Sequence, residues 1–267
     1  MSSTTRQQLR CLLPHRSTRL KVAAAAFGLL PFQASFADDY PAPIQALEKE
    51  GLEVYGEFDA PEGLTGYAAS HQGQPMTIFV TADGEHAIVG NLLDSNATNL
   101  SEEPLERLVQ VPMDDVAWQN LGNSAWIADG SDDAERIVYV FTDPNCPYCT
   151  RFYHDSRPWV ESGKVQLRHV MVGILDPAKS PRQAVTMLAA DDPSAMLAAH
   201  ESGDAVEPLK NLPRELEQRL QDNHNLFYGF GMVATPGIVY YNGDKLEMSQ
   251  GAPTPEQMTT IMGSELN

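Results

Sequence analysis

Short apolar runs separated by turn residues fill the chain between residues 43 and 91. Pro43 to Glu50 carries apolar residues at helical spacing and is closed by Gly51, so it predicts a short amphipathic helix. The runs that follow have strand character, and the turn Asp83-Gly84 is a strong hairpin signal. The expected strands are 52–58, 64–70, 76–81 and 85–91. A helix and a small antiparallel sheet of about 60 residues bury little surface alone and often need a partner.

The next segment predicts a helix that links two domains. Leu105, Leu108 and Val109 recur at helical spacing, and Ser101 is a suitable cap. Pro104 is tolerated because it falls in the first turn. We therefore expect three parts after the leader: an N-terminal domain over 38–98, a linker helix over 99–115 and a second domain over 116–267.

The second domain alternates strand and helix patterns. Ile137 to Thr142 is apolar at successive positions, which is typical of a central strand covered on both faces. A turn, a helix over 147–160 and a strand over 165–172 complete a βαβ unit. The remaining expected elements are helices over 180–200 and 214–230, strands over 237–241 and 245–249, and a closing helix over 256–262.

The first 37 residues have the order of a secretory signal. Five basic residues and no acidic one occupy positions 1–21, and an apolar run from Val22 to Phe32 leads to a small-residue site that ends at Ala37. The run is shorter than the ~20 apolar residues that a spanning helix needs. Cys11 precedes the run instead of ending it. We expect cleavage after Ala37, no lipid on Cys11 and no stable membrane insertion; a basic leader followed by a buried helix is the alternative.

Charge and cysteine content narrow the function. Without the leader, thirteen basic residues remain against thirty-six acidic ones, a formal charge of −23. Nucleic acid and anionic lipid would repel such a chain, so neither is an expected partner. Cys146 and Cys149 are then the only cysteines. A disulfide that closes so small a loop stabilises little, which favours a chemical role over a structural one.

A pair of cysteines two residues apart is also half of many zinc sites. Zinc needs two further ligands, and no third cysteine remains. The later histidines show no ligand-like pairing: His154, His169, His200 and His224. We expect no metal and no cofactor beyond the dithiol and disulfide forms of the pair itself. A plain structural disulfide remains the other alternative.

The tetrapeptide Cys146-Pro147-Tyr148-Cys149 predicts a reactive thiol at a helix start. Proline favours the first helical position, which makes Cys146 the N-cap and Cys149 the third helical residue. Unpaired N–H groups and the positive end of the helix dipole stabilise a thiolate at the N-cap. We expect Cys146 to attack an oxidised substrate cysteine and Cys149, better shielded from solvent, to expel the substrate thiol.

These residues carry a resemblance to a known family. The segment VYVFTDPNCPYC, its continuation from Arg157 to Arg168, and Ala234-Thr235-Pro236 resemble the bacterial periplasmic DsbC/DsbG disulfide-interchange family, over essentially the whole chain after the leader. The resemblance implies a thioredoxin-like catalytic domain with a helical insertion and a cystatin-like N-terminal dimerisation domain, in an α+β chain that forms homodimers. It implies isomerisation of disulfides, reduction of sulfenylated cysteines and chaperone-like holding of exported proteins, with recycling by a membrane reductase similar to DsbD.

The resemblance also implies site residues. Pro236 matches the family's cis-proline, and Thr235 matches the residue before it, whose backbone can pair with an extended substrate. Pro147 and Tyr148 match the residues that tune the active thiol. In one departure from thioredoxins, Val140 stands where they carry a buried carboxylate. Asp143 is nearer the cysteines, and we interpret it as a turn residue before the helix rather than a proton acceptor for Cys149.

Two other functions remain open at this point. A net oxidant would use the same cysteines with a destabilised disulfide and a different recycling partner. A holdase would shelter unfolded proteins on an apolar surface while its cysteines are incidental.

Overall fold

The computed structural model describes residues 40–265. The expected signal over 1–37 and Cys11 lie outside these residues. Within them, no helix is long and apolar enough to cross a bilayer.

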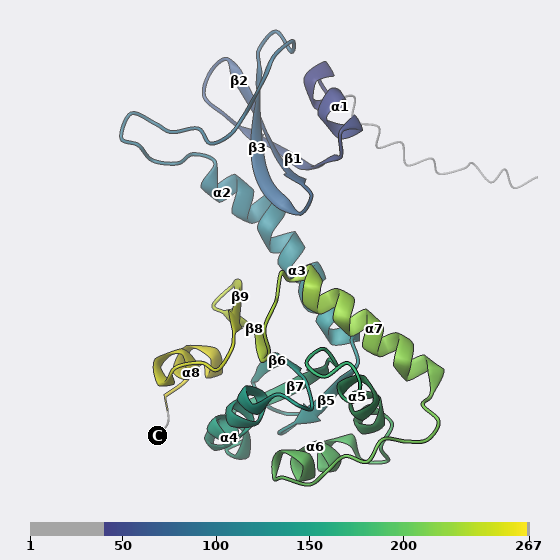
Figure 1. Ribbon diagram of the computed structural model, residues 1–267. Helices are drawn as coiled ribbons and strands as arrows, with labels where there is room; N and C mark the ends of the chain where they lie inside the picture. Colours follow the sequence, from purple (N-terminus) through teal and green to yellow (C-terminus); the bar gives the residue numbers. More distant parts are fainter. Residues whose placement is uncertain (1–39, 266–267) are drawn as a thin grey trace, which may run out of the picture. The chain divides into compact units, whose positions relative to one another are not determined.

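The N-terminal part is a four-stranded antiparallel sheet with a helix packed on it (Figure 1). Its elements are α1 (Ala42–Lys49), β1 (Leu52–Asp59), β2 (Leu64–His71), β3 (Gln74–Thr81) and β4 (Ala87–Val89). The helix and the four strands confirm the expectation, although β4 is shorter than 85–91. Tyr67 and Ile78 pack with Ile44 of α1, whereas Ala68 and Phe79 pack with Val109 of the next helical segment. Because both faces are covered, β2 and β3 are buried at successive positions.

The linker is a helical segment that runs further than expected. It consists of α2 (Glu102–Leu105), the π-helical turn η1 (Glu106–Gln110) and α3 (Val111–Asn123). Pro112 lacks an N–H group and cannot continue the ladder of bonds, and the wider turn directly precedes it. The helix continues past residue 115 because Trp118 and Leu121 pack against the second sheet, with the Trp118 and Tyr139 rings 4.7 Å apart.

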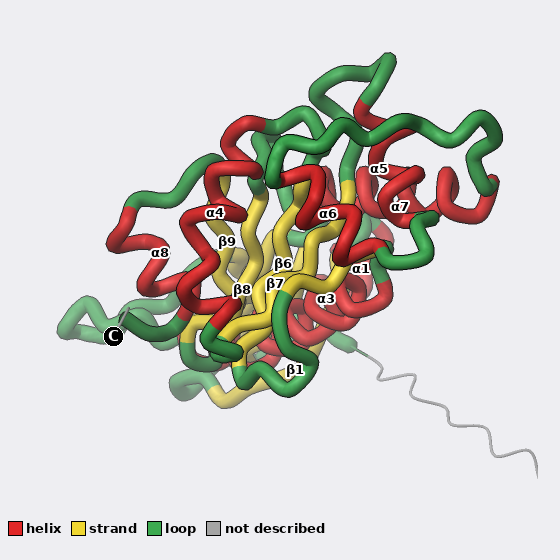
Figure 2. The backbone as a smooth tube through the Cα atoms, turned by 90° about the horizontal axis from the view of Figure 1, so that it is seen from below, coloured by secondary structure: helices red, strands yellow, loops and turns green. Residues whose placement is uncertain are grey.

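A mixed five-stranded sheet forms the second part. Its strands are β5 (Trp126–Asp129), β6 (Arg136–Thr142), β7 (Val165–Met171), β8 (Gly237–Asn242) and β9 (Lys245–Gln250), in the order β5-β7-β6-β8-β9. β6 and β7 are parallel and the other neighbours antiparallel. Figure 2 shows these strands side by side in yellow. The central position of β6 confirms the expectation drawn from its continuous apolar run.

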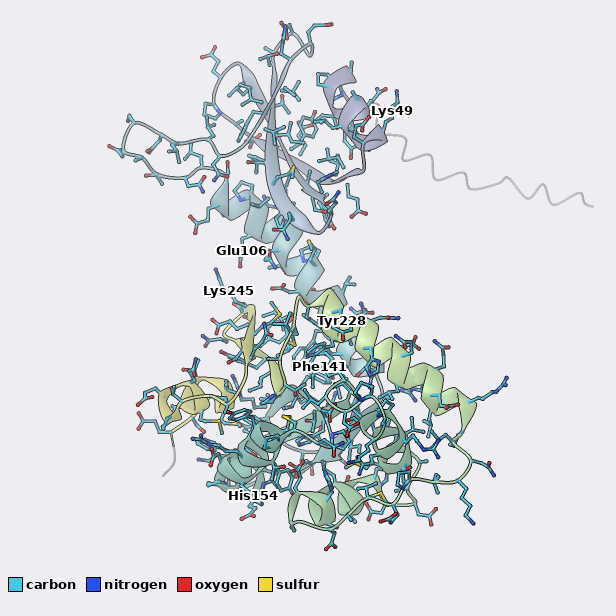
Figure 3. The ribbon with its side chains drawn as sticks, viewed as in Figure 1. Lys49, Glu106, Phe141, His154, Tyr228 and Lys245 are labelled. Carbon is cyan, nitrogen blue, oxygen red and sulfur yellow. A yellow bond between two sulfur atoms is a disulfide. The ribbon has the colours of Figure 1, made fainter. Side chains whose placement is uncertain are left out.

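Helices cover both faces of this sheet. They are α4 (Pro147–Glu161), α5 (Ser180–Leu188), α6 (Pro193–Glu201), α7 (Arg214–Gly229) and α8 (Pro255–Met262). Val138 and Val140 face α4 and α8. Tyr139 and Phe141, the latter labelled in Figure 3, face α3 and α7. Alternate residues of β6 therefore pack into the two cores on opposite faces of the sheet. The strand ends at Thr142, four residues before Cys146.

The expectation of a single helix over 180–200 is wrong. The segment 180–200 is two helices, because Asp192 adopts an extended conformation and its carboxylate accepts a hydrogen bond from the N–H of Ala195 at 2.9 Å. Asp192 is thus an N-cap, and Pro193 takes the first helical position of α6. Together with α7, these two helices occupy the chain between β7 and β8.

Candidate active site

Cys146 caps the helix that carries the pair. Its backbone is extended, with φ −99° and ψ 106°, Pro147 follows in the first turn, and the N–H of Cys149 donates to the sulfur of Cys146 at 3.1 Å. The expected N-cap geometry is confirmed. The two cysteines are joined by a disulfide. In the dithiol form, the same N–H and the helix dipole would stabilise a thiolate on Cys146 relative to the thiol.

The expected difference in shielding between the two cysteines is not present in this disulfide form. Cys146 is 3% exposed and Cys149 is 2% exposed. The carbonyl oxygen of Thr235 lies 3.5 Å from the sulfur of Cys146. Its chain neighbours are open to solvent, and Tyr148 is 58% exposed. The two sulfurs differ in hydrogen bonding, because the sulfur of Cys146 accepts the N–H of Cys149 at the helix start.

Thr235 lies beside the disulfide, and the bond to Pro236 has the isomer that the resemblance implied. The peptide bond between them is cis. Thr235 is 6% exposed, and its hydroxyl oxygen is buried without a hydrogen-bond partner within residues 40–265. The chain thus brings a segment 89 residues further along into contact with the sulfur of Cys146.

Asp143 holds the turn that precedes the helix. It is 1% exposed, and its carboxylate accepts bonds from the N–H groups of Ile174 at 2.7 Å and Leu175 at 2.9 Å. The hydroxyl of Ser180 donates at 2.7 Å and the N–H of Asn145 at 2.8 Å. The last bond is that of a turn residue, as expected. Four donors bond to the two oxygens of the carboxylate, so the side chain anchors the turn. No lone pair on these oxygens is left to accept a proton from Cys149.

Three further contacts tie this turn to α5 and α6. The side-chain amide of Asn145 donates to Ser180 at 2.9 Å and to Gln183 at 2.8 Å. The imidazole Nε2 of His200 lies 2.7 Å from the carbonyl oxygen of Pro144. No local sequence pattern marks these supports, because the bonded residues lie more than thirty positions apart.

Comparisons with known proteins agree with this geometry. The profile of the thioredoxin-like domain family matches residues 130–264. The chain is 45% identical over 234 residues to the thiol:disulfide interchange protein DsbG of Pseudomonas aeruginosa, covering 86% of this chain and 91% of that protein. The chain belongs to the DsbG family. It is also 39% identical to DsbG of Escherichia coli over 241 residues, covering 89% of this chain and 96% of that protein.

Membership of the DsbG family makes the chain a thiol:disulfide interchange enzyme with Cys146 and Cys149 as its CxxC pair. The fold class is confirmed: a thioredoxin-like domain with a helical insertion, joined to a small N-terminal sheet domain. Among solved structures, the catalytic domain of Proteus mirabilis ScsC is similar, with 24% identity and a TM-score of 0.47, over 56% of this chain and 94% of that one.

Position 140 carries valine, where the resemblance placed the carboxylate of thioredoxins. Val140 is fully buried in an apolar cluster with Phe152 and Leu167. His169 pairs with Val140 on the neighbouring strand, and it is held by Thr142 at 3.0 Å and by Asp129 at 3.3 Å. Within the part of the chain that the structure describes, no carboxylate is bonded to Cys149.

Asp129 on β5 lies between two basic side chains, His169 and Arg157. Burial alone would raise its pKa, but hydrogen bonds and charge from His169 and Arg157 outweigh burial and lower the pKa to about 2. The guanidinium of Arg157 forms a two-pronged ion pair with it and lies 3.7 Å from the ring centre of Tyr153 on α4. This network fastens α4 to β5.

The described residues contain no group of three His, Cys, Asp or Glu side chains placed to hold a metal ion. The histidines that sequence analysis considered have other contacts: His154 with the carbonyl of Glu201 and His224 with the N–H of Gly173. Burial lowers the pKa of His224, which fits a neutral ring that accepts this bond.

Proposed function

We propose that the chain acts on oxidised cysteines of exported proteins in the periplasm, with Cys146 as the nucleophile and Cys149 as the resolving thiol. The observation that carries the proposal is the N-cap geometry, in which the sulfur of Cys146 receives the N–H of Cys149 at 3.1 Å. A sulfur held over the open amides of a helix start is ionised more readily than a free thiol, and the thiolate is the attacking species.

The reaction proceeds in two exchanges. The Cys146 thiolate attacks one sulfur of a client disulfide, a new sulfur–sulfur bond forms, and the other client sulfur leaves as a thiolate. The Cys149 thiolate then attacks the sulfur of Cys146 and releases the reduced client, so the client gains two electrons and the pair becomes the disulfide seen here. With a sulfenic acid as client, the first step releases water instead of a thiol. Rearrangement of the client before the second step gives isomerisation.

Thr235 and Pro236 would bind the client segment. The carbonyl of Thr235 contacts the sulfur of Cys146, and its N–H has no hydrogen-bond partner within residues 40–265, so an extended client strand could pair with both groups. Pro147 would tune the thiolate by fixing the helix start, and the exposed Tyr148 would do so from the solvent side.

Trapping of client proteins on a variant without the resolving thiol tests this proposal. Cys149→Ser removes the resolving thiol, so clients should accumulate as mixed disulfides on Cys146 in the native periplasm. Cys146→Ala together with Cys149→Ser is the matched control and should trap nothing. Absence of adducts, with client binding unaffected by Cys146→Ala, would instead favour a holdase whose cysteines are incidental.

We further propose that residues 38–98 form a dimerisation domain, with 99–115 as the linker helix and 116–267 as the catalytic domain. The support lies in β4, a short edge strand on which Ile88 and Val89 are 57% and 54% exposed. An open edge with apolar side chains is suited to pairing with a second copy. A hydrodynamic mass of two chains at micromolar concentration would support this assembly, and a mass of one chain would reject it.

Return of the pair to the dithiol needs an external reductant, which we propose is a membrane thiol reductase similar to DsbD. Export through the leader over 1–37 places the chain with that partner. The cellular redox state distinguishes this cycle from net oxidation. A predominantly reduced pair at steady state supports reduction and isomerisation, whereas a predominantly oxidised pair supports the oxidant.

A further inference from the structure

The loop that carries the cis-proline is fastened on both sides of Thr235 by the end of β9. On the upstream side, the side-chain oxygen of Gln250 accepts the N–H of Val233 at 2.8 Å and that of Ala234 at 3.3 Å. On the downstream side, the N–H of Gly251 donates to the carbonyl of Pro236 at 2.9 Å. Two consecutive residues of one strand end therefore hold the loop on either side of the residue that faces Cys146.

The base of the loop is fixed separately. Met232 is 1% exposed, and its N–H donates to the carbonyl of Phe227 at 3.2 Å. Its sulfur lies where a side chain on residue 237 would have to go, so Gly237 is required for this packing. Beyond this base, Val233 is 84% exposed, and the two bonds to Gln250 are the hydrogen bonds that hold the N–H groups of residues 233 and 234.

These bonds decide which backbone groups remain open. The N–H groups of Val233 and Ala234 and the carbonyl of Pro236 are occupied, whereas the N–H of Thr235 has no partner within the described residues. The carbonyl of Thr235 lies 3.5 Å from the sulfur of Cys146, which carries no proton in the disulfide. One residue thus presents a free donor and a free acceptor beside the reactive sulfur.

We infer that Gln250 is a positioning residue for client peptides. Its side-chain oxygen accepts the N–H groups of Val233 and Ala234 and so holds Thr235 in position to pair with an extended segment. The inference rests on the proposed function, in which Thr235 binds the client backbone. Gln250 touches neither sulfur, and its side chain is exposed. It therefore acts on recognition of a backbone and not on the reactivity of Cys146.

The test compares two disulfides with the same leaving group. One is a short unstructured peptide whose single cysteine is bonded to 2-mercaptoethanol, and the other is 2-hydroxyethyl disulfide, which has no backbone to pair. The rate of reaction of the reduced full chain with each is measured by quenched flow and mass spectrometry. The readout is the ratio of the peptide rate to the small-disulfide rate, in which any change in the ionisation of Cys146 cancels.

Gln250→Met keeps the length of the side chain and removes the accepting oxygen, and the ratio should fall by about three- to tenfold, as expected for the loss of one or two hydrogen bonds. Gln250→Glu keeps an accepting oxygen and should retain the wild-type ratio. Gln221→Met, on the exposed face of α7, is the control for a glutamine exchange and should leave both rates unchanged.

An unchanged ratio in Gln250→Met, whether both rates hold or both fall together, would overturn the inference. A loss in Gln250→Glu equal to that in Gln250→Met would also overturn it, because the accepting oxygen would then be irrelevant. A reduced wild-type chain that reacts with neither disulfide would reject the proposed function itself, which separates that failure from the failure of Gln250.

Discussion

Replacing Asp143 by alanine should destabilise the thioredoxin-like domain strongly. The carboxylate accepts four hydrogen bonds of 2.7–2.9 Å while 1% exposed. Removing it leaves four donors without their acceptor, and at ~1 kcal/mol for each donor the free energy of unfolding should fall by about 4 kcal/mol. This loss is a large part of the free energy of unfolding of an ordinary domain, which is about 5–15 kcal/mol.

Urea unfolding followed by tryptophan fluorescence measures this loss. Trp126 and Trp159 lie in the second part of the chain, and Trp118 on α3 packs against its sheet, so the signal reports the correct domain. Asp143→Asn keeps one accepting oxygen but places an NH2 group opposite the other donors. Its free energy of unfolding should lie between those of wild type and Asp143→Ala. Asp133→Ala, an exposed turn position, is the control. A free energy of unfolding for Asp143→Ala within about 1 kcal/mol of the wild-type value would refute the anchoring role.

Two other predictions concern buried polar groups. Because the folded pKa of Asp129 is about 2, below its unfolded value, its carboxylate stabilises the fold above pH ~4 and this contribution is lost as the pH falls toward 2. Asp129→Asn should therefore flatten the acid limb of stability against pH, by about 2 kcal/mol, while Asp133→Asn should not; an unchanged acid limb would contradict the pKa. Asn223 is fully buried and bonds to both backbone groups of Ala125 and to the carbonyl of Met171. Asn223→Ala should lower the free energy of unfolding by about 3 kcal/mol and exposed Asn225→Ala by less than about 0.5, and equal effects in the two variants would contradict the assignment.

Local rules were sufficient for the start of the active-site helix. Pro147 at the first helical position and an extended Cys146 before it follow from proline's fixed φ and the needs of open amides, and both could be derived from the tetrapeptide. The central place of β6 was likewise readable, since a strand apolar at successive positions must be covered on both faces. The break at Asp192-Pro193 carried the same kind of local signal and was missed because the apolar spacing continues across it.

The supports of the site were not readable in this way. Thr235 contacts the sulfur of Cys146, and the turn before it is held by Ser180, Gln183 and His200. These contacts depend on how distant segments meet in the folded chain, and the residue types involved are ordinary at exposed positions. Asp143 lay between the two cases: its preference for turns was evident, but its three donors from outside the turn appear only in the fold.

The proposed reaction depends above all on ionisation of the Cys146 thiol, which can be measured. In reduced Cys149→Ser, the absorbance of the thiolate near 240 nm is followed against pH, with Cys146→Ser/Cys149→Ser as the blank. We expect a titration midpoint well below that of an ordinary thiol, about 8.5, because the helix start stabilises the charged sulfur. A midpoint at or above that value would contradict this expectation.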